Sequence, residues 1–260
     1  MSLSSTPAAA ESTPFVQPAA MLLAAGRGER MRPLTDVTPK PLLAVQGMPL
    51  LQHHMQALLQ AGVRQAVINT GWLGEQIPAR FGSVFSLQTN KDRFEQLSVS
   101  YSAEPAQAFE TAGGIARALP QLGAAFWLAA GDVYAPDFDF PAAAAEVFVT
   151  SDQLAHLWLV PNPAHNLRGD FGLSEQGLAL DLAADAQRPR YTYSTIALLK
   201  AELFAQPWLD IPVGNPEGVR APLAPLLRRA MAAGRVGASL YTGRWTDVGT
   251  PERLAQLNQD

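Results

Sequence analysis

The sequence contains no cysteine, which excludes disulfide bonds and thiolate-bound metal ions. Charge is also scarce: Asp, Glu, Lys and Arg make up 16% of the 260 residues, against roughly 25% in a typical soluble domain. The net charge of −4 offers no basic surface for nucleic acid or an anionic membrane. No apolar run approaches the roughly 18 residues that a membrane-spanning helix needs. We therefore expect neither nucleic acid nor a membrane as a partner, and a cytoplasmic location.

Lysine is nearly absent as well, since it occurs only at Lys40, Lys91 and Lys200. A ligand rich in phosphate must then be held by a few cations at defined places, most of them arginines. The hydrophobic content of 48% is enough to build a real core. Length and composition together favour one domain with an elaboration over two separate domains.

Residues 1–18 are rich in Ser, Pro and Ala and lack the charged and apolar regions of a signal peptide. We predict a disordered lead-in there and a single domain over residues 19–260. Apolar runs that read as strands alternate with helical patterns in the first half of that domain. The predicted strands are 19–25, 65–70, 97–103, 124–132, 154–162, 171–180 and 190–199, and the predicted helices are 49–62, 73–81, 111–122, 221–234 and 251–258.

This alternation predicts an α/β fold with a parallel sheet and helices on both faces. The later strands, over about residues 154–200, follow one another without helices between them. They predict an elaboration of the same domain.

A glycine-rich loop follows the first predicted strand, within residues 22–43. Gly26 and Gly28 allow backbone N–H groups to approach phosphate oxygens, and Arg27, Arg30 and Arg32 add charge-assisted contacts. The loop is neither a Walker A motif nor a dinucleotide fingerprint, whose third glycine would fall on Met31. A glycine turn with solvated arginines remains the structural alternative.

The full string AAGRGERMRPLT…PKPL resembles the signature of the sugar nucleotidyltransferase family, which includes the glucose-, mannose-, N-acetylglucosamine- and N-acetylmuramate-1-phosphate enzymes. The matching positions are Leu23, Ala24, Ala25, Gly26, Gly28, Arg30, Met31, Pro33, Thr35, Pro39, Lys40, Pro41 and Leu42. The resemblance implies a Rossmann-like nucleotidyltransferase fold with a mixed, mostly parallel sheet and helices on both faces. It also implies that the chain joins an NTP to a sugar 1-phosphate and releases pyrophosphate.

The resemblance assigns roles to individual residues. Arg30 would hold the β- and γ-phosphates, and Lys40 would bridge the phosphates near the α-position; both are implied to be catalytic. The implied nucleotide-binding residues are Ala24, Ala25, Gly26, Gly28, Glu29, Arg30, Lys40, Glu104 and Gly113.

Two aspartates stand at positions where family members hold a divalent metal. Asp132 follows Gly131 at the end of an apolar strand, and Asp247 lies in Trp245-Thr-Asp-Val-Gly-Thr-Pro-Glu252. Taken alone, each is ordinary turn or helix-start chemistry. The resemblance implies that both hold Mg²⁺, the cofactor that phosphoryl transfer to a nucleotide requires.

Two further segments resemble the small N-acetylmuramate-1-phosphate uridylyltransferases. In ETAGGI (110–115), Glu110 stands where guanylyl-transferring relatives often have glycine, and a capped helix start is the plain alternative. In RGDFGL (168–173), Asp170 would accept hydrogen bonds from sugar hydroxyls and Arg168 would bind a lactyl carboxylate; a solvated turn is the alternative.

Two departures from the family pattern concern the sugar end. The usual E-K-P segment reads Gln187-Arg188-Pro189, so that Arg188 or Arg190 would replace its lysine. Thr195 stands where a glycine is usual. Sugar identity is therefore harder to predict than the reaction.

We expect transfer of UMP from UTP to N-acetylmuramic acid 1-phosphate, a step of cell-wall sugar recycling. The enzyme alternative is a mannose- or glucose-1-phosphate nucleotidyltransferase, and the other alternative is a non-catalytic nucleotide-sugar-sensing domain. The expected partners are the two small-molecule substrates, and the expected state is a monomer or a small homo-oligomer.

Overall fold

The computed structural model describes residues 15–90, 93–105, 107–183 and 185–259. Most of the predicted lead-in, residues 1–14, lies outside the described residues. Within the remainder of that lead-in, Gln17 is buried, accepts a hydrogen bond from Trp127 Nε1 and donates to the carbonyl of Phe140. The packed part of the chain therefore begins before Ala19.

The strands belong to one large sheet and two small ones. The large sheet contains β1 (Ala19–Ala24), β4 (Gln65–Thr70), β5 (Val84–Asn90), β6 (Arg93–Ala103), β7 (Ala125–Ala130), β9 (Ala155–Val160), β10 (Phe171–Leu173), β11 (Ala179–Leu180), β12 (Arg190–Lys200) and β13 (Val236–Leu240). The small sheets pair β2 (Ala44–Val45) with β3 (Met48–Pro49) and β8 (Val133–Tyr134) with β14 (Thr246–Asp247).

Six α-helices and five short 3-10 helices lie in the described residues. The α-helices are α1 (Leu50–Gln60), α2 (Gln76–Phe81), α3 (Glu110–Ala118), α4 (Ala142–Thr150), α5 (Leu223–Ala232) and α6 (Pro251–Leu257). The 3-10 helices are Glu29–Met31, Leu34–Asp36, Lys40–Leu42, Leu119–Gln121 and Ala201–Phe204. None of the described helices is long and apolar enough to cross a membrane.

The large sheet has a parallel centre with antiparallel strands on either side. Its order is β11-β10-β12-β7-β1-β4-β6-β5, and β9 pairs with both β12 and β13. The pairs β7–β1, β1–β4 and β4–β6 are parallel, whereas β12–β7 and β5–β6 are antiparallel. The sheet is therefore mixed, as predicted.

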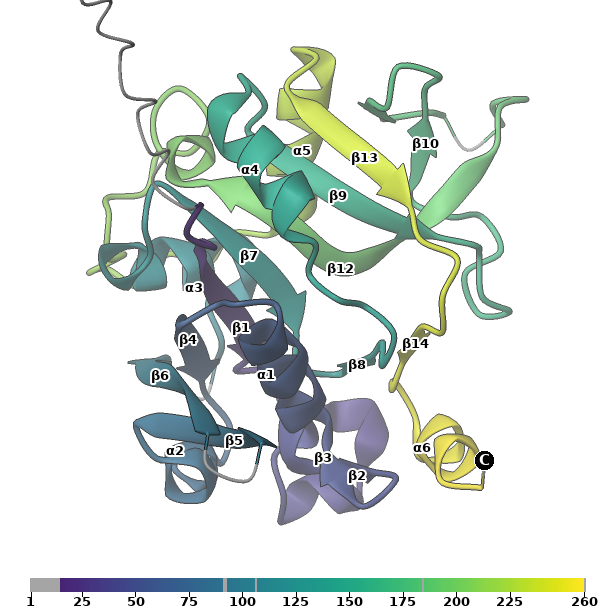
Figure 1. Cartoon of the computed structure of the whole chain (residues 1–260). Coiled ribbons are helices and arrows are strands. Elements are labelled where there is room, and N and C mark those ends of the chain that lie inside the picture. The colour runs from purple at the N-terminus through teal and green to yellow at the C-terminus, as the bar shows by residue number, and fades with distance from the viewer. Residues whose placement is uncertain (1–14, 91–92, 106, 184, 260) are drawn as a thin grey trace, which may run out of the picture.

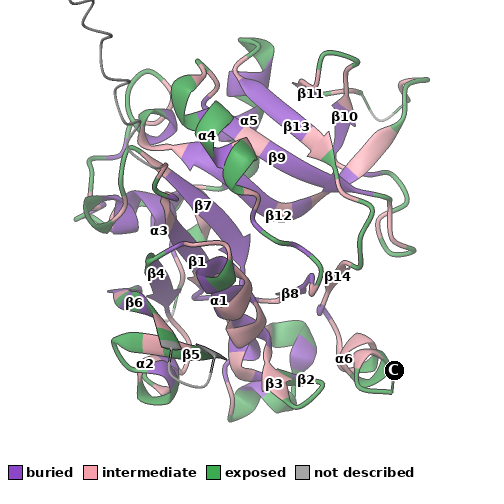
Figure 2. Ribbon diagram, viewed as in Figure 1, coloured by how far each residue is buried: buried purple, intermediate pink, exposed green. Residues whose placement is uncertain are grey.

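Helices cover both faces of this sheet, because alternate residues of the central strands point to opposite sides. Leu22 of β1 belongs to the same apolar cluster as Met55 of α1, while Met21 packs in a second cluster with Leu226 of α5. Figure 1 shows α1 and α4 in front of the sheet, and Figure 2 shows that the central strands between the layers are buried. The predicted Rossmann-like architecture is confirmed.

A third, smaller cluster attaches the C-terminal segment to the first loop. Val248, Leu254 and Leu257 pack against a group that includes Met31 and Leu50. Together with the β8–β14 pair, this contact brings the C-terminal segment back to the glycine-rich loop, although more than 200 residues separate them in sequence.

Candidate active site

A cavity of about 540 Å³ opens where the parallel strands end. Ala24 lies at the end of β1, Asn69 near the end of β4 and Ala130 at the end of β7, and all three line it. Ligands of open α/β sheets bind at this carboxyl edge. The volume falls within the range of about 300–1,000 Å³ for small-molecule sites.

The cavity collects most of the residues that the sequence assigned to nucleotide binding and catalysis. Its lining includes Ala24, Ala25, Gly26, Gly28, Glu29, Arg30, Lys40, Glu104 and Asp132. Gly113 is not part of that lining, and its position is described below.

The glycine-rich loop needs glycine at one position in particular. Gly28 has φ 65°, and a Cβ there would lie 3.1 Å from a methyl carbon of Thr35 and 3.2 Å from Lys40 Cβ. Thr35 also donates a hydrogen bond to the carbonyl of Gly28. Gly28 therefore permits the tight packing that sets the loop beside Lys40.

Two of the three arginines of this loop, Arg27 and Arg30, have different surroundings. Arg27 donates to the carbonyl of Thr35 and to Asp36, and its guanidinium lies 3.7 Å from the centre of the Trp72 ring. Arg30 is exposed, lines the cavity and has no hydrogen-bond or ion-pair partner among the residues that the structure describes. Arg27 thus stabilises the loop, and Arg30 is available to an anionic ligand.

Lys40 is held inside the cavity wall. It begins a 3-10 turn between Pro39 and Pro41, is only 9% exposed, and its Nζ lies 2.5 Å from Asp132 Oδ2. The cation and the carboxylate neutralise each other in the ligand-free site. An incoming phosphate would share Lys40 with Asp132.

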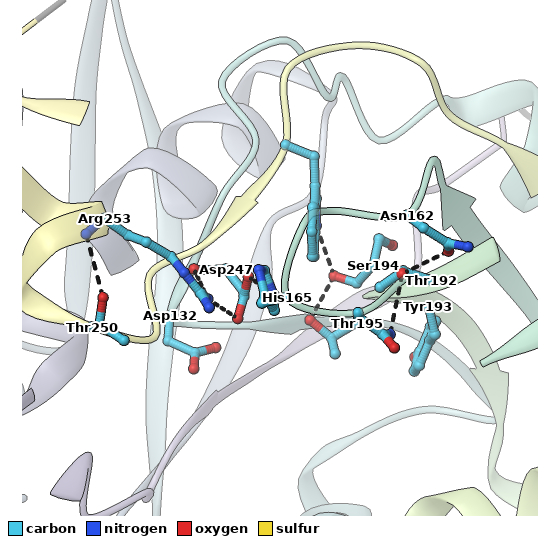
Figure 3. Close-up of polar contacts among 12 residues, drawn as sticks. Asp132, Asn162, His165, Thr192, Tyr193, Ser194, Thr195, Asp247, Thr250 and Arg253 are labelled. Carbon is cyan, nitrogen blue, oxygen red and sulfur yellow. Dashed lines mark hydrogen bonds and ion pairs between the residues drawn. The ribbon is translucent and has the colours of Figure 1, made fainter. Parts of the chain in front are cut away.

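The two predicted metal ligands lie together on the β8–β14 ribbon. Asp247 stands opposite Val133 in that pair, and the N–H of Val248 donates to the carbonyl of Asp132 at 2.8 Å. Figure 3 shows the two aspartate side chains beside each other. The ribbon therefore joins two carboxylates that are 115 positions apart in sequence, 247 minus 132.

Asp247 lies between two cationic or potentially cationic groups. Arg253 Nη1 is 2.7 Å from Asp247 Oδ2, and His165 Nε2 is 2.8 Å from Oδ1 (Figure 3). The geometry at Oδ1 is not that of a hydrogen bond, so this buried oxygen accepts none in the described structure. The sequence analysis missed His165, and its sequence position gave no signal, because it lies 82 residues before Asp247.

These residues fit a magnesium ion. The described residues contain no cluster of three or more Asp, Glu or His side chains that could hold a metal. Mg²⁺ does not need such a cluster, because it keeps several waters and takes one or two carboxylates together with substrate phosphates. Asp132 and Asp247 supply two carboxylates, and the buried Oδ1 of Asp247 retains its capacity to accept.

A hydrogen-bonded chain fixes the opposite wall of the cavity. Asn69 accepts from the N–H of Ala24 at 2.7 Å and donates to Glu104 Oε1 at 2.6 Å. Glu104 Oε2 accepts from the N–H of Phe109 at 2.7 Å. Asn69 was not predicted from the sequence. It could have been found as a polar residue near the end of the mostly apolar strand QAVINT.

Gly113, predicted to bind the nucleotide, lies at a tight packing contact of α3. A Cβ on Gly113 would lie 2.5 Å from the carbonyl oxygen of Val219, so this glycine permits α3 to pack on the 219–221 segment. The neighbouring Gly114 faces the cavity wall instead, because its Cβ would lie 2.4 Å from Glu104 Oε1.

The predicted sugar-binding residues lie outside this cavity. Asp170 Oδ2 accepts from the N–H of Tyr193 at 2.8 Å, and Asp170 O accepts from Arg190. Its side chain therefore fixes β12. Arg168 and Arg188 are exposed and have no partner among the described residues.

A second cavity of about 260 Å³ adjoins the first. Four residues line both cavities: Leu23, Glu110, Thr111 and Thr195. Glu110 also forms an ion pair with Arg220 at 3.3 Å. Arg220 is thus a cation beside a residue that lines both cavities, and the sequence did not reveal it.

Comparison with known proteins agrees with this geometry. The sequence profile of the MobA-like NTP transferase domain matches residues 20–235. The chain belongs to this family. Its nucleotidyltransferase membership, expected from the glycine-rich loop, is confirmed.

Two relatives match this NTP transferase over most of their length. An N-acetylmuramate alpha-1-phosphate uridylyltransferase of Neisseria meningitidis serogroup B is 45% identical over 249 residues, which is 91% of this chain and 95% of the relative. A protein of the same name from Caulobacter vibrioides is 31% identical over 90% of this chain and 92% of its own length.

Solved structures of nucleotidyltransferases share the fold. A Bacillus anthracis protein assigned as a glucose-1-phosphate thymidylyltransferase superposes with a TM-score of 0.74 at 20% identity, covering 94% of each chain. The inositol-1-phosphate CTP transferase of T. maritima gives a TM-score of 0.68 at 17% identity, covering 94% of this chain and 96% of its own.

Proposed function

We propose that this chain transfers the uridylyl group of UTP to N-acetylmuramic acid 1-phosphate and releases pyrophosphate. The reaction is supported by one observation above all: Arg30, Lys40, Asp132 and Asp247 gather at the carboxyl edge of the sheet. The choice of substrates is supported by the two relatives of that name, which align over about nine-tenths of the chain. Retention of all four charged groups argues against a domain that only senses nucleotide sugars.

The reaction forms a bond between a sugar-phosphate oxygen and the α-phosphorus of UTP, and the bond from that phosphorus to the β-phosphate oxygen breaks. The attacking oxygen is already an anion, so no protein base is required. Catalysis then consists of positioning and charge neutralisation. Arg30 would bind the departing β- and γ-phosphates, and Lys40 would move from Asp132 towards the α-phosphate.

Asp132 and Asp247 would hold Mg²⁺, which supplies positive charge to the polyphosphate. The other residues of the wall orient the nucleotide. Two hydrogen bonds, from Ala24 N–H to Asn69 and from Asn69 to Glu104, fix the edge on which the nucleoside would lie. They do so because they join the ends of neighbouring strands. We further infer that the reaction is a cytoplasmic step of cell-wall sugar recycling, since UTP is a cytoplasmic substrate and N-acetylmuramate a cell-wall sugar.

A pyrophosphate-release assay tests this proposal directly. UTP, GTP and ATP are each combined with the 1-phosphates of N-acetylmuramate, N-acetylglucosamine, glucose and mannose. We expect the highest kcat/KM for UTP with N-acetylmuramate 1-phosphate. A higher value for GTP with mannose 1-phosphate would overturn the substrate assignment, and no turnover with any pair would overturn the reaction.

A further inference from the structure

The second cavity differs in chemistry from the first. Its wall is formed largely by Leu23, Leu128, Phe171, Leu223 and Leu227. None of its lining residues is a lysine or an arginine. Its 260 Å³ correspond to about nine water molecules at ~30 Å³ each. A phosphate has no counter-charge there, whereas a small apolar group fits.

Two residues at the junction of the cavities have an unusual backbone. Glu110 and Thr195 both have φ 60°, a conformation that favours glycine, and both line the two cavities. The other four described non-glycine residues with positive φ line neither cavity: Gln46, Leu73, Phe140 and Asn215. Strained non-glycine residues persist where their side chains have a use, and they concentrate at functional sites.

The two residues reach the junction from different parts of the fold. Glu110 begins α3, and its carboxylate is held beside the junction by Arg220 at 3.3 Å. Thr195 lies at the irregularity where the pairing of β12 with β9 shifts between Tyr193 and Ala197. The bulge turns Thr195 out of the ladder and towards both cavities.

The second cavity also contains an unsatisfied polar side chain. The hydroxyl of Tyr193 is buried and has no hydrogen-bond partner in the described structure, and Tyr193 lines this cavity. Burial raises the pKa of Tyr193, so the group remains a neutral donor. The hydroxyl is closed off from solvent, so Tyr193 contributes its other atoms to the wall of the cavity.

We propose that the second cavity receives the acyl substituent of an N-acylated sugar 1-phosphate, and that Glu110 and Thr195 are specificity-determining residues at its entrance. The apolar wall accommodates the methyl group of that substituent. Glu110 accepts a hydrogen bond from the amide N–H or a sugar hydroxyl. This inference rests on the proposed function, and it names the part of the substrate that selects N-acylated sugars.

A substitution that fills the cavity provides the first test. Ala224 is exposed on α5 and lines the second cavity, so Ala224→Leu would narrow it. Ala232→Leu is the matched control, because Ala232 is exposed on the same helix and lines neither cavity. With UTP saturating, we expect Ala224→Leu to lower kcat/KM for N-acetylmuramate and N-acetylglucosamine 1-phosphates at least tenfold and for glucose 1-phosphate less than threefold. Equal losses for all three sugars, or none, would overturn the proposal.

Glycine substitutions at the entrance provide the second test. Glu110→Gly and Thr195→Gly keep the backbone and remove the side chains, and Gln46→Gly does the same at a positive-φ position outside both cavities. We expect all three variants to keep or raise the melting temperature. Only the first two should lower the preference for N-acylated over unsubstituted sugars, by tenfold or more and mainly through the KM of the sugar phosphate. An unchanged preference in both would overturn their role.

The two proposals fail differently. A wild-type preference for an unsubstituted sugar contradicts the proposed function. A wild-type preference for N-acetylmuramate 1-phosphate that survives Ala224→Leu, Glu110→Gly and Thr195→Gly leaves that function intact and contradicts only the second cavity's role.

Discussion

The phosphate side and the sugar side of the site use their polar groups in opposite ways. On the phosphate side, Arg27 stabilises the loop and Arg30 is left without a partner among the described residues. On the proposed sugar side, polar groups form hydrogen bonds with one another: Asn162 and Asn166 contact Thr192, and Asp170 accepts from the backbone of β12. The first region is prepared for an anionic ligand, and the second is prepared mainly to hold its own strands.

Because of this difference, the residues proposed for the reaction are separate from the residues proposed for sugar specificity. The residues proposed to bind phosphate, Arg30 and Lys40, lie in the segment after β1, and the proposed metal ligands, Asp132 and Asp247, lie at the β8–β14 pair. The proposed choice of sugar depends on the side chains at the junction of the two cavities, above all Glu110, which pairs with Arg220, and Thr195, which donates to the carbonyl of Ser194. A sugar pocket of this kind changes its substrate by altering a small number of residues, while the phosphate chemistry stays the same.

The largest effect is expected on the phosphate side. Asp132→Asn and Asp247→Asn should each reduce kcat at least ~1,000-fold, because a lost metal ligand removes several kcal/mol of charge stabilisation. Circular dichroism should show an intact fold in both variants. Near-wild-type kinetics in either variant at limiting Mg²⁺ would contradict its assignment as a metal ligand.

Replacing Arg30 or Arg27 compares a residue proposed to bind phosphate with one that stabilises the same loop. Arg30→Ala should lower kcat/KM by about 10²–10³, since one lost contact to a developing anion costs about 3–4 kcal/mol. Arg27→Ala should instead lower the melting temperature with little kinetic change, because Arg27 contacts Thr35, Asp36 and Trp72. Equal and mild kinetic losses in the two variants would restore the interpretation of a solvated loop.

A pH titration compares two histidines, of which His54 is buried and His156 is partly buried. Burial lowers the pKa of both His54, on α1, and His156, on β9, to about 4, from an ordinary value of 6.5. The unfolded chain therefore binds a proton first, and folding stability falls as the pH drops from 6.5 towards 4. Between pH 6.5 and 5, each histidine should remove about 2 kcal/mol, at 1.36 kcal/mol per pH unit.

Urea unfolding midpoints as a function of pH measure this effect. His54→Leu should flatten the slope between pH 6.5 and 5 by about half, because His156 supplies the other half. An unchanged slope in His54→Leu would show that His54 is not held neutral by the fold.

The smallest effects are expected on the sugar side. Asp170→Ala should destabilise the fold by about 1.5 kcal/mol, because the N–H of Tyr193 loses its charged acceptor. Arg168→Ala and Arg188→Ala should change stability by less than about 0.5 kcal/mol, since both side chains are exposed and unpaired in the described structure.

The same two arginine variants also test recognition of the lactyl carboxylate. The arginine that binds it should, when replaced, lower the preference for N-acetylmuramate over N-acetylglucosamine 1-phosphate about tenfold, as expected for one charge-assisted hydrogen bond. If neither variant changes the preference, Arg220 beside Glu110 is the next residue to replace.

The sequence predicted the structure best where one continuous segment supplies the residues of the site. The strand–loop–turn from Ala19 to Leu42 forms as predicted, because one continuous segment supplies its glycines, prolines and cations. The pairing of Asp132 with Asp247 was predicted only through the family resemblance. Its physical cause is the β8–β14 ribbon, two strands of two residues each, which carry no periodic pattern of their own.

The contacts that the sequence did not predict join residues that are far apart along the chain. His165 reaches Asp247 from a turn after β9, and Asn69 joins Ala24 to Glu104 across neighbouring strands; no local spacing encodes either contact. Asp170 was assigned to the sugar because RGDFGL resembles the N-acetylmuramate-1-phosphate uridylyltransferases, and in the fold its Oδ2 accepts a hydrogen bond from the backbone of β12. The helix α4 was missed because its run AAAAEVFVT has no clear apolar stripe.

A one-pot competition measures the central claim most directly. The enzyme, Mg²⁺ and equal concentrations of UTP, GTP and ATP are mixed with equal concentrations of the four sugar 1-phosphates, and mass spectrometry follows the first nucleotide sugar to accumulate. The account predicts UDP-N-acetylmuramate at least tenfold ahead of every other product. Initial accumulation of a GDP- or ADP-linked sugar, or of UDP-glucose, would contradict it.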